Sequence, residues 1–414
     1  MVDVVSDVAR GPRLGLEPPR TPLKTSVAPM EGFTTFPTRV WLAMASCPAA
    51  MTTPFLRVTR THPDGHLPLL FAPELFELRG VMPYDLTPQL ITGDVDLFLK
   101  TAALLPPEAT AAIELNCGCP SPSCVGQQAG SGILRDPAHF GRTIEELATD
   151  LGPKRLAVKM RLGVDDAAEF DELTSVIASL PLARLTVHGR TRADRYRGRA
   201  RWDLIERAAN ITAIPTWASG DVCGMETARE LRDMAPTISG VMIGRGLLRN
   251  PWIFDELRTQ SHQSIDIVTL ANALVSYALL NELSIKAPEK LVAKLRGGRL
   301  LSYCGTEAPA WEQMAAELTS MVARVPMVVN RHGQIGEIGL SNTSFGRLRV
   351  LWGYLRSSLP EPFHAPKIMR TKGLSEFFAA IFLGASEVDE TPLVLRHQPA
   401  WDSLYGGARG SAST

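Results

Sequence analysis

The chain has 414 residues, of which 45% are apolar and 21% charged, and its 43 basic side chains balance 43 acidic ones. These values predict a globular protein with one large and one smaller domain. They exclude a globally basic surface, so a polyanion would have to meet a local basic patch. Six cysteines exclude a disulfide scaffold and favour a reducing, cytoplasmic setting. We expect no signal peptide, and no membrane span, because polar residues interrupt the most apolar segment, 269–285.

Short apolar runs dominate the first two thirds of the chain. Residues 1–24 are rich in Pro, Gly and Arg and are expected to form a loose arm. Eight runs then alternate with helical patterns, at 25–30, 49–55, 85–91, 111–116, 156–160, 184–189, 213–220 and 239–246. Near-continuous apolarity is typical of parallel strands buried on both faces. Residues 25–265 are therefore predicted to form a TIM (β/α)8 barrel. The alternative, an open doubly wound sheet, lacks a G-x-G-x-x-G after its first strand.

Helical spacing replaces the strand pattern beyond about residue 265. We expect a smaller, all-helical C-terminal domain over 266–375, with an insertion around 298–344. Residues 376–414 are predicted to be a tail, and the Gly- and Ser-rich end should be disordered.

Polar or glycine residues follow nearly every predicted strand, where a TIM barrel carries its chemistry. In chain order these candidates are Pro29, Met30, Glu31, Gln89, Asn116, Cys119, Lys159, His188, Ser219, Gly220, Asp221, Gly244 and Arg245. The last two loops, "ASGD" and "IGRG", stand where barrels commonly bind a phosphate, and their glycines would let backbone N–H groups approach it. The alternative is two ordinary tight turns.

Two of these positions, Lys159 and His188, allow more than one interpretation. Lys159 could form a Schiff base, balance an anionic cofactor, or extend its ammonium toward solvent. Arg161 shares its strand face, and two cations together favour an anion. His188 is either a structural histidine or a contact to cofactor or substrate.

The cysteines Cys117, Cys119 and Cys124 lie within eight positions. No further soft ligand follows at metal-site spacing, so we predict no metal, and a Cys117–Cys119 disulfide would be strained. Buried, inert thiols are a fair reading for Cys117 and Cys124. Cys119 lies beyond the strand end and before Pro120, so it should face the barrel mouth, as a nucleophile or a general acid.

Arginines concentrate in residues 188–202, where six of them alternate with Tyr196 and Trp202. This segment suits RNA phosphates and bases, although a solvated charged loop is the alternative. The residues predicted to contact RNA are Arg190, Arg192, Tyr196 and Arg197 of this segment, Arg57 after the second strand, and Arg349 and Arg356 on one helical face.

Together the motifs resemble the flavin-dependent tRNA-dihydrouridine synthases. "APMEG", "ELNCGCPSP…GILRDP", "VKMRLG", "LTVHGRT", "ASGD" and "GVMIGRG" follow that family's order over roughly 25–265. "RLRVLWGYLRS" is similar to its tRNA-binding helical domain, and "APMEG", "TTPFLRV" and "NCGCPS" are most similar to the bacterial subfamily that modifies uridine 16 of the D-loop. Ser219 stands where the family usually has Asn, and Pro122 lies where a family lysine is expected.

The resemblance implies an FMN enzyme that acts on tRNA, and we expect it to be a monomer. NADPH would reduce the flavin, which would pass hydride to C6 of a uridine while Cys119 protonates C5. Pro29–Glu31 and Gln89 would hold the flavin ring, with Lys159 and His188 beside it, and Ser219–Asp221, Gly244 and Arg245 would bind its phosphate. Asn116 would contact the base or flavin. Two alternatives are an FMN barrel that acts on a small molecule, like dihydroorotate dehydrogenases, and a non-catalytic tRNA-binding relative.

Overall fold

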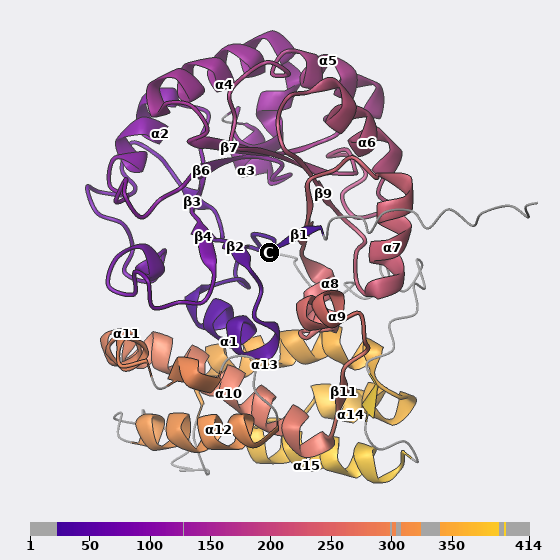
Figure 1. The fold of residues 1–414 in the computed structure, drawn as a ribbon. Helices are drawn as coiled ribbons and strands as arrows, with labels where there is room; N and C mark the ends of the chain where they lie inside the picture. The colour runs from indigo at the N-terminus through magenta and orange to yellow at the C-terminus, as the bar shows by residue number, and fades with distance from the viewer. Residues whose placement is uncertain are drawn as a thin grey trace, which may run out of the picture.

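A computed structural model describes residues 23–126, 128–298, 300–303, 308–323, 340–388 and 393–394. Nearly all of the predicted N-terminal arm, and parts of the predicted insertion and tail, lie outside these ranges. Figure 1 shows a ring of strands with helices around it and a layer of further helices along one side.

The strands form a closed parallel barrel, as the apolar runs predicted. Each run contains β structure: β1 (Lys24–Val27), β2 (Ala50–Thr52), β3 (Leu56–Arg57), β4 (Asp85–Thr87), β5 (Gln89–Ile91), β6 (Ile113–Cys117), β7 (Leu156–Arg161), β8 (Arg184–His188), β9 (Thr216–Ser219) and β10 (Gly240–Ile243). Two runs are interrupted at Pro54 and Pro88, because proline has no N–H for the ladder. β2 pairs with β4 and β3 with β5, so these two runs still lie side by side.

Strand pairing then closes the ring. β5 pairs with β6, each later strand pairs with the next as far as β10, β10 pairs with β1, and β1 pairs with β2. The open doubly wound sheet is therefore excluded. All of these strands run parallel, so their carboxyl ends share one rim of the barrel.

Helices cover the outside of the barrel (Figure 1), namely α1 (Phe36–Ser46), α2 (Val95–Ala102), α4 (Pro137–Leu151), α5 (Phe170–Ser175), α6 (Trp202–Ile211), α7 (Met225–Met234) and α8 (Arg245–Arg249). Asp94 and Asp136 cap α2 and α4 by accepting hydrogen bonds from Leu97 N at 3.0 Å and His139 N at 2.9 Å. Successive strand residues point to opposite faces, so Leu115 and Cys117 of β6 pack outward under the helices while Glu114 and Asn116 face the barrel interior.

The helical layer contains α9 (Ile253–Thr259), α10 (Ile267–Lys286), α11 (Pro288–Arg296), α12 (Ala308–Ala323), α13 (Asn342–Leu355), α14 (Pro366–Met369) and α15 (Leu374–Ser386). α10 is its central element, packed against α1, α12 and α13. Contrary to our expectation for this segment, α10 is long and apolar enough to cross a membrane, but 72% of the relevant window is buried, as in the core helix of a domain. The indole of Trp41 in α1 donates a hydrogen bond to Ala273 O at 2.8 Å and packs edge-on against Tyr277.

The helical layer continues past residue 375, into the segment predicted to be a tail. Phe377 and Ile381 of α15 are fully buried, and the ring of Phe377 lies 5.6 Å from that of Trp352 in α13. The apolar spacing of α15 allows it to pack on the layer, which the boundary drawn from the sequence overlooked. β11 (Ser264–Ile265) also pairs with β12 (Leu393–Val394).

Candidate active site

Four polar side chains form a hydrogen-bonded network inside the barrel. Gln89 Nε2 donates to Glu114 Oε1 at 2.6 Å, and Asn116 Nδ2 donates to Gln89 Oε1 at 2.8 Å. Arg184 balances Glu114, with 2.8 Å between Nη2 and Oε2. The sequence singled out Gln89 and Asn116 but neither Glu114 nor Arg184, because an ion pair between β6 and β8 leaves no local signal. The network fixes the amide orientations of Gln89 and Asn116.

The loop after β6 holds Cys119 through several hydrogen bonds. Asn116 Oδ1 accepts from the backbone N–H groups of Gly118 and Cys119, each at 2.9 Å. Arg161 Nε donates to Gly118 O at 2.9 Å, and Ser131 Oγ donates to Cys119 O at 2.9 Å. Gly130 has a φ of +58°, and a Cβ there would lie 2.8 Å from Cys119 O, so only glycine fits. Asn116, predicted to contact a base or flavin, thus also positions Cys119.

The Cys119 thiol is half-buried and packs beside a small apolar cluster of Ile91, Cys124 and Ala129. Burial raises the pKa of the Cys119 thiol to about 11, and Cys124 and Glu31 shift it in the same direction. The thiol is therefore protonated at neutral pH. Of the two roles that the sequence left open, this favours a proton donor over a thiolate nucleophile.

The neighbouring cysteine Cys117 is fully buried on the outer face of β6, and burial raises the pKa of its thiol further than that of Cys119. This position agrees with the prediction that Cys117 is a buried, unreactive thiol. Within the described parts of the chain, no three His, Cys, Asp or Glu side chains gather in a way that could hold a metal ion.

Cations gather at the part of the mouth that begins beside the Cys119 loop, at the ends of β7, β8 and β10. Burial lowers the pKa of Lys159 to about 8, although Glu114 opposes the shift. Burial, together with Arg161, Lys159, Arg190 and Arg245, holds the pKa of His188 well below its ordinary value, so the imidazole is neutral at pH 7. The Lys159 ammonium makes no hydrogen bond or ion pair with any residue that the structure describes.

Tyr196 lies over this cation cluster, although the sequence placed it among the RNA contacts. Its side chain is 47% exposed, and the Arg245 guanidinium lies 4.1 Å from the centre of its ring. The Arg161 guanidinium lies 5.7 Å from the same ring, and the imidazole of His188 lies 6.1 Å from it. Several cations beneath an exposed aromatic ring fit an anionic aromatic ligand.

Arg190 and Asp221 have a different role from the one that the sequence predicted. Arg190 was expected to contact RNA, yet it is fully buried; its Nη2 lies 2.6 and 2.7 Å from the two Asp221 carboxylate oxygens and donates to Gly198 O at 2.6 Å. The Ala200 N–H donates to the same carboxylate at 2.6 Å. The prediction for Arg190 is therefore wrong, and the Asp221 side chain faces Arg190 rather than a free phosphate site. The pair fastens the loop after β8 to the loop after β9.

Other predicted cofactor residues meet near the cation cluster. Ser219 is in register with His188, and Gly220 follows it with a φ of +113°. The Pro29–Glu31 turn is held by Thr34 Oγ1, which accepts from Met30 N at 2.8 Å. The sulfur of Met30 lies beside Gly244, so the first and last loops of the barrel meet next to Arg245.

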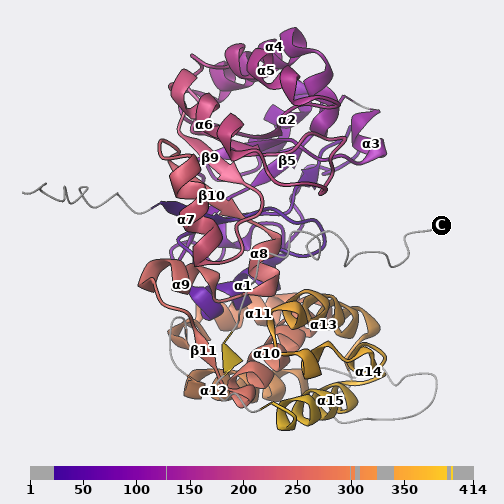
Figure 2. The same ribbon diagram turned by 90° about the vertical axis from the view of Figure 1, so that its right-hand side faces the viewer.

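The remaining predicted RNA contacts do not form one cluster. Arg197 is exposed, and Arg192 is partly buried. Arg349 lies over the ring of Phe345, and Arg356 donates to His364 O at 3.1 Å, both in the helical layer. α3 (Pro122–Val125) of the Cys119 loop and α13 lie on the same side of the molecule, at the right of Figure 2. RNA could therefore reach both from one direction.

Comparison with known proteins shows which family this chain is similar to. The family model for dihydrouridine synthase matches residues 26–288. A probable tRNA-dihydrouridine synthase of Rickettsia prowazekii is 33% identical over 171 residues, which are 41% of this chain and 51% of that protein. A tRNA-dihydrouridine(16) synthase of Haemophilus ducreyi is 34% identical over 187 residues, 44% of this chain and 56% of that one.

Among solved structures, morphinone reductase aligns with a TM-score of 0.41 and 11% identity, over 57% of this chain and 86% of that one. The present chain spans about half the length of the curated relatives that it matches, between 51% and 56% for the two named above.

Proposed function

Because the chain belongs to the dihydrouridine synthase family, we propose that it reduces the C5=C6 bond of a uridine in tRNA. The observation that best supports this activity is the protonated Cys119 thiol, held at the barrel mouth beside a cluster of cations. Reduction of this bond requires a hydride donor and an acid that acts on the neighbouring carbon. Cys119 can serve as the acid, and the cation cluster could hold a cofactor that supplies the hydride.

The cation cluster is the proposed site for flavin mononucleotide. When bound, the flavin would supply the hydride, obtained from NADPH, that goes to C6 of the uracil. Lys159 and His188 would lie beside its ring, while Ser219, Gly244 and Arg245 would hold its phosphate. The ammonium of Lys159 would favour the anionic form of this ligand, while neutral His188 would contribute no charge of its own.

Cys119 would donate its thiol proton to C5. The Asn116 amide and the Arg161 guanidinium hold the backbone of this loop, so the thiol can keep one position while the base enters. A uridine in folded RNA is stacked, and it must turn out of its stack to reach a thiol at the barrel mouth. The exposed arginines of the 188–202 loop, together with the partly buried Arg349 of α13, would bind the phosphates around it.

We further propose uridine 16 of the D-loop as the target, because the loop motifs resemble that subfamily and one relative is named a tRNA-dihydrouridine(16) synthase. We also propose that the protein works in the cytoplasm, where tRNA is available, because its described cysteines are free thiols.

Lys159→Met is expected to weaken binding of flavin mononucleotide by about 30-fold or more at pH 7, because it removes a buried charge opposite an anion. Wild-type affinity should decline as pH rises through about 8, where the Lys159 ammonium loses its proton, whereas the variant should lack this decline. Titrating apoprotein with flavin between pH 6.5 and 9.5, followed by flavin fluorescence, measures both effects. Lys100→Met on the surface of α2 is the control, and equal affinities in all three proteins would contradict the role of Lys159.

The same variant should melt at a higher temperature without flavin. The folded-state pKa of Lys159 lies below its ordinary value, so its ammonium destabilises the fold fully below about pH 8, and the penalty fades as pH rises toward the unfolded value. The gain in melting temperature should therefore shrink between pH 8 and 10.

The activity itself is tested by mapping dihydrouridine in unmodified tRNA after incubation with protein, flavin and NADPH. Reduction at a single D-loop uridine supports both the reaction and its position. Reduction at a different uridine would refute position 16 alone. Flavin-loaded protein that oxidises NADPH but leaves tRNA unchanged would instead favour a small-molecule oxidoreductase.

A further inference from the structure

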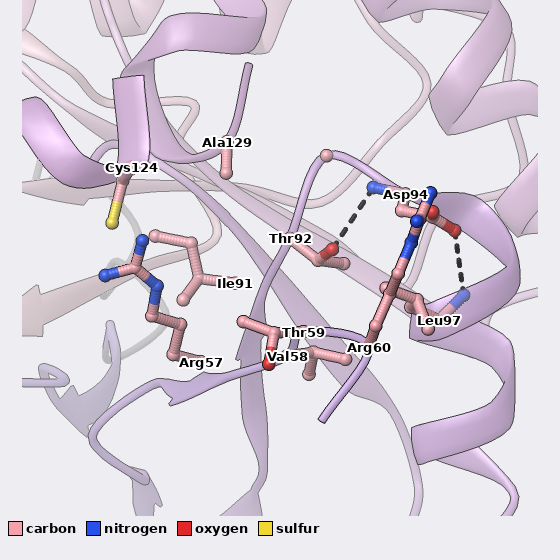
Figure 3. A pocket seen from close by; sticks show the side chains of 11 residues that line it. Arg57, Val58, Thr59, Arg60, Ile91, Thr92, Asp94, Leu97, Cys124 and Ala129 are labelled. Carbon is pink, nitrogen blue, oxygen red and sulfur yellow. Dashed lines mark hydrogen bonds between the residues drawn. The ribbon is translucent and has the colours of Figure 1, made fainter. Parts of the chain in front are cut away.

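A pocket of about 430 Å³ opens at the barrel rim, over the ends of β3 and β5 (Figure 3). The loop after β3 contributes Arg57 and Arg60, the start of α2 contributes Asp94, and the Cys119 loop contributes Cys124 and Ala129. This position is beside the proposed proton donor and separate from the cation cluster over β7, β8 and β10. Its volume falls in the range of sites that hold molecules of nucleotide size.

One wall of the pocket is apolar and is shared with the Cys119 site. Ile91, Cys124 and Ala129 line the pocket, and they are also the cluster against which Cys119 packs. Each of the three is buried, so this wall is held in place by the surrounding core and only a few of its atoms reach the pocket. A flat apolar group resting on this wall would therefore lie next to whatever Cys119 protonates.

The other wall carries a net positive charge. This wall contains two arginines, Arg57 and Arg60, and one carboxylate, that of Asp94. The Asp94 carboxylate also accepts a hydrogen bond from Leu97 N, with which it caps α2. The Arg57 guanidinium is anchored on Ser123, to Oγ at 3.1 Å and to the backbone oxygen at 2.9 Å. Arg60 is exposed and makes no hydrogen bond or ion pair with any described residue. Its guanidinium can therefore take a phosphate without breaking an existing contact.

We propose that this pocket binds the nucleotide next to the uridine being reduced, with its base on the Ile91–Cys124–Ala129 wall and its phosphate on Arg60. The proposal rests on the proposed function, since it assumes that RNA delivers its uridine to Cys119. The strand that carries a turned-out uridine must cross the rim within one nucleotide of the thiol. The pocket shares its apolar wall with Cys119 and combines that wall with an arginine, the two features that bind a single-stranded nucleotide.

Arg60→Ala combined with a neutralised phosphate tests this contact. In tRNA with an uncharged methylphosphonate at one of the two phosphates flanking the target uridine, wild-type kcat/KM should fall by about 5- to 20-fold, mainly through KM. Arg60→Ala should cause a similar loss with ordinary tRNA. Combining the two should lower kcat/KM no further than either alone, because both remove the same contact. A tRNA that lacks the base of the nucleotide next to the target uridine should also raise the KM of the wild-type protein.

Three results would each overturn the proposal. The combined change could lower kcat/KM by the product of the two single losses. Arg60→Ala could be as efficient as the wild type, or the wild type could use the abasic tRNA normally. Arg207→Ala is the charge-matched control, because Arg207 lies on α6 and pairs with Asp171 at 2.8 Å on the outer face of the barrel. Wild-type protein that fails to reduce ordinary tRNA would refute the proposed function instead, so the two failures are distinct. Flavin content and melting temperature should be unchanged in Arg60→Ala.

Discussion

Cys119→Ala is expected to lower the rate of uridine reduction by about 10²- to 10⁴-fold, the usual contribution of a positioned general acid. The thiol is protonated at neutral pH, and Asn116, Arg161 and Ser131 hold the backbone of its loop, so its removal takes away a positioned proton donor. Flavin binding and reduction of the flavin by NADPH should persist, because neither uses the thiol. Single-turnover reduction of tRNA, with flavin saturating, measures the chemical step.

Cys117→Ala is the matched control, because Cys117 lies two residues away but faces the outer helices. It should lose some stability and retain its rate. The wild-type rate should hold up to about pH 10 and then decline as the Cys119 thiol approaches its pKa of about 11. Full activity in Cys119→Ala would show that another group donates the proton.

Asp221→Asn is expected to lower the free energy of unfolding by about 3–5 kcal/mol, since it leaves the buried Arg190 guanidinium without a counter-charge. Both carboxylate oxygens of Asp221 are engaged, and an amide can accept only through one of them. Urea denaturation of the apoprotein measures the loss. Flavin affinity should fall as well, because the pair fastens the loop that carries His188 and Tyr196.

Glu108→Gln provides the comparison for this prediction. Its partner Arg79 and Glu108 itself are more than half exposed, and breaking such a surface pair should change the free energy of unfolding by less than about 1 kcal/mol. If Asp221→Asn were equally mild, the Arg190–Asp221 contact would not hold the two loops together.

The barrel could be predicted from the sequence because its strands are buried on both faces and each reads as an apolar run. The breaks at Pro54 and Pro88 did not hide those runs, since pairing resumes on either side of each proline. Positions along the rim, such as Cys119 and Lys159, were predictable for the same reason: the end of a parallel strand marks the mouth. α15 was missed because the domain boundary drawn at residue 375 cuts through its first turn and assigned the rest of the helix to the tail.

Side-chain partners could not be predicted in the same way. Arg190 and Asp221 lie 31 positions apart, and within an arginine-rich segment nothing distinguishes a buried guanidinium from exposed ones. The position of Tyr196 over the Arg245 guanidinium likewise depends on how two loops fold together. The protonation state of Cys119 is set by burial, which local sequence does not encode.

Helix α1 joins the barrel and the helical layer into one cooperative unit. All residues of α1 are buried. On one side Trp41 donates a hydrogen bond to Ala273 O of α10, and on the other side α1 packs against the barrel. A barrel separated after residue 265 would expose this indole and the apolar face around it, so it should aggregate rather than fold alone. The two parts should therefore denature in a single transition. Exchanging the helical layer between relatives would require α1 to be exchanged with it.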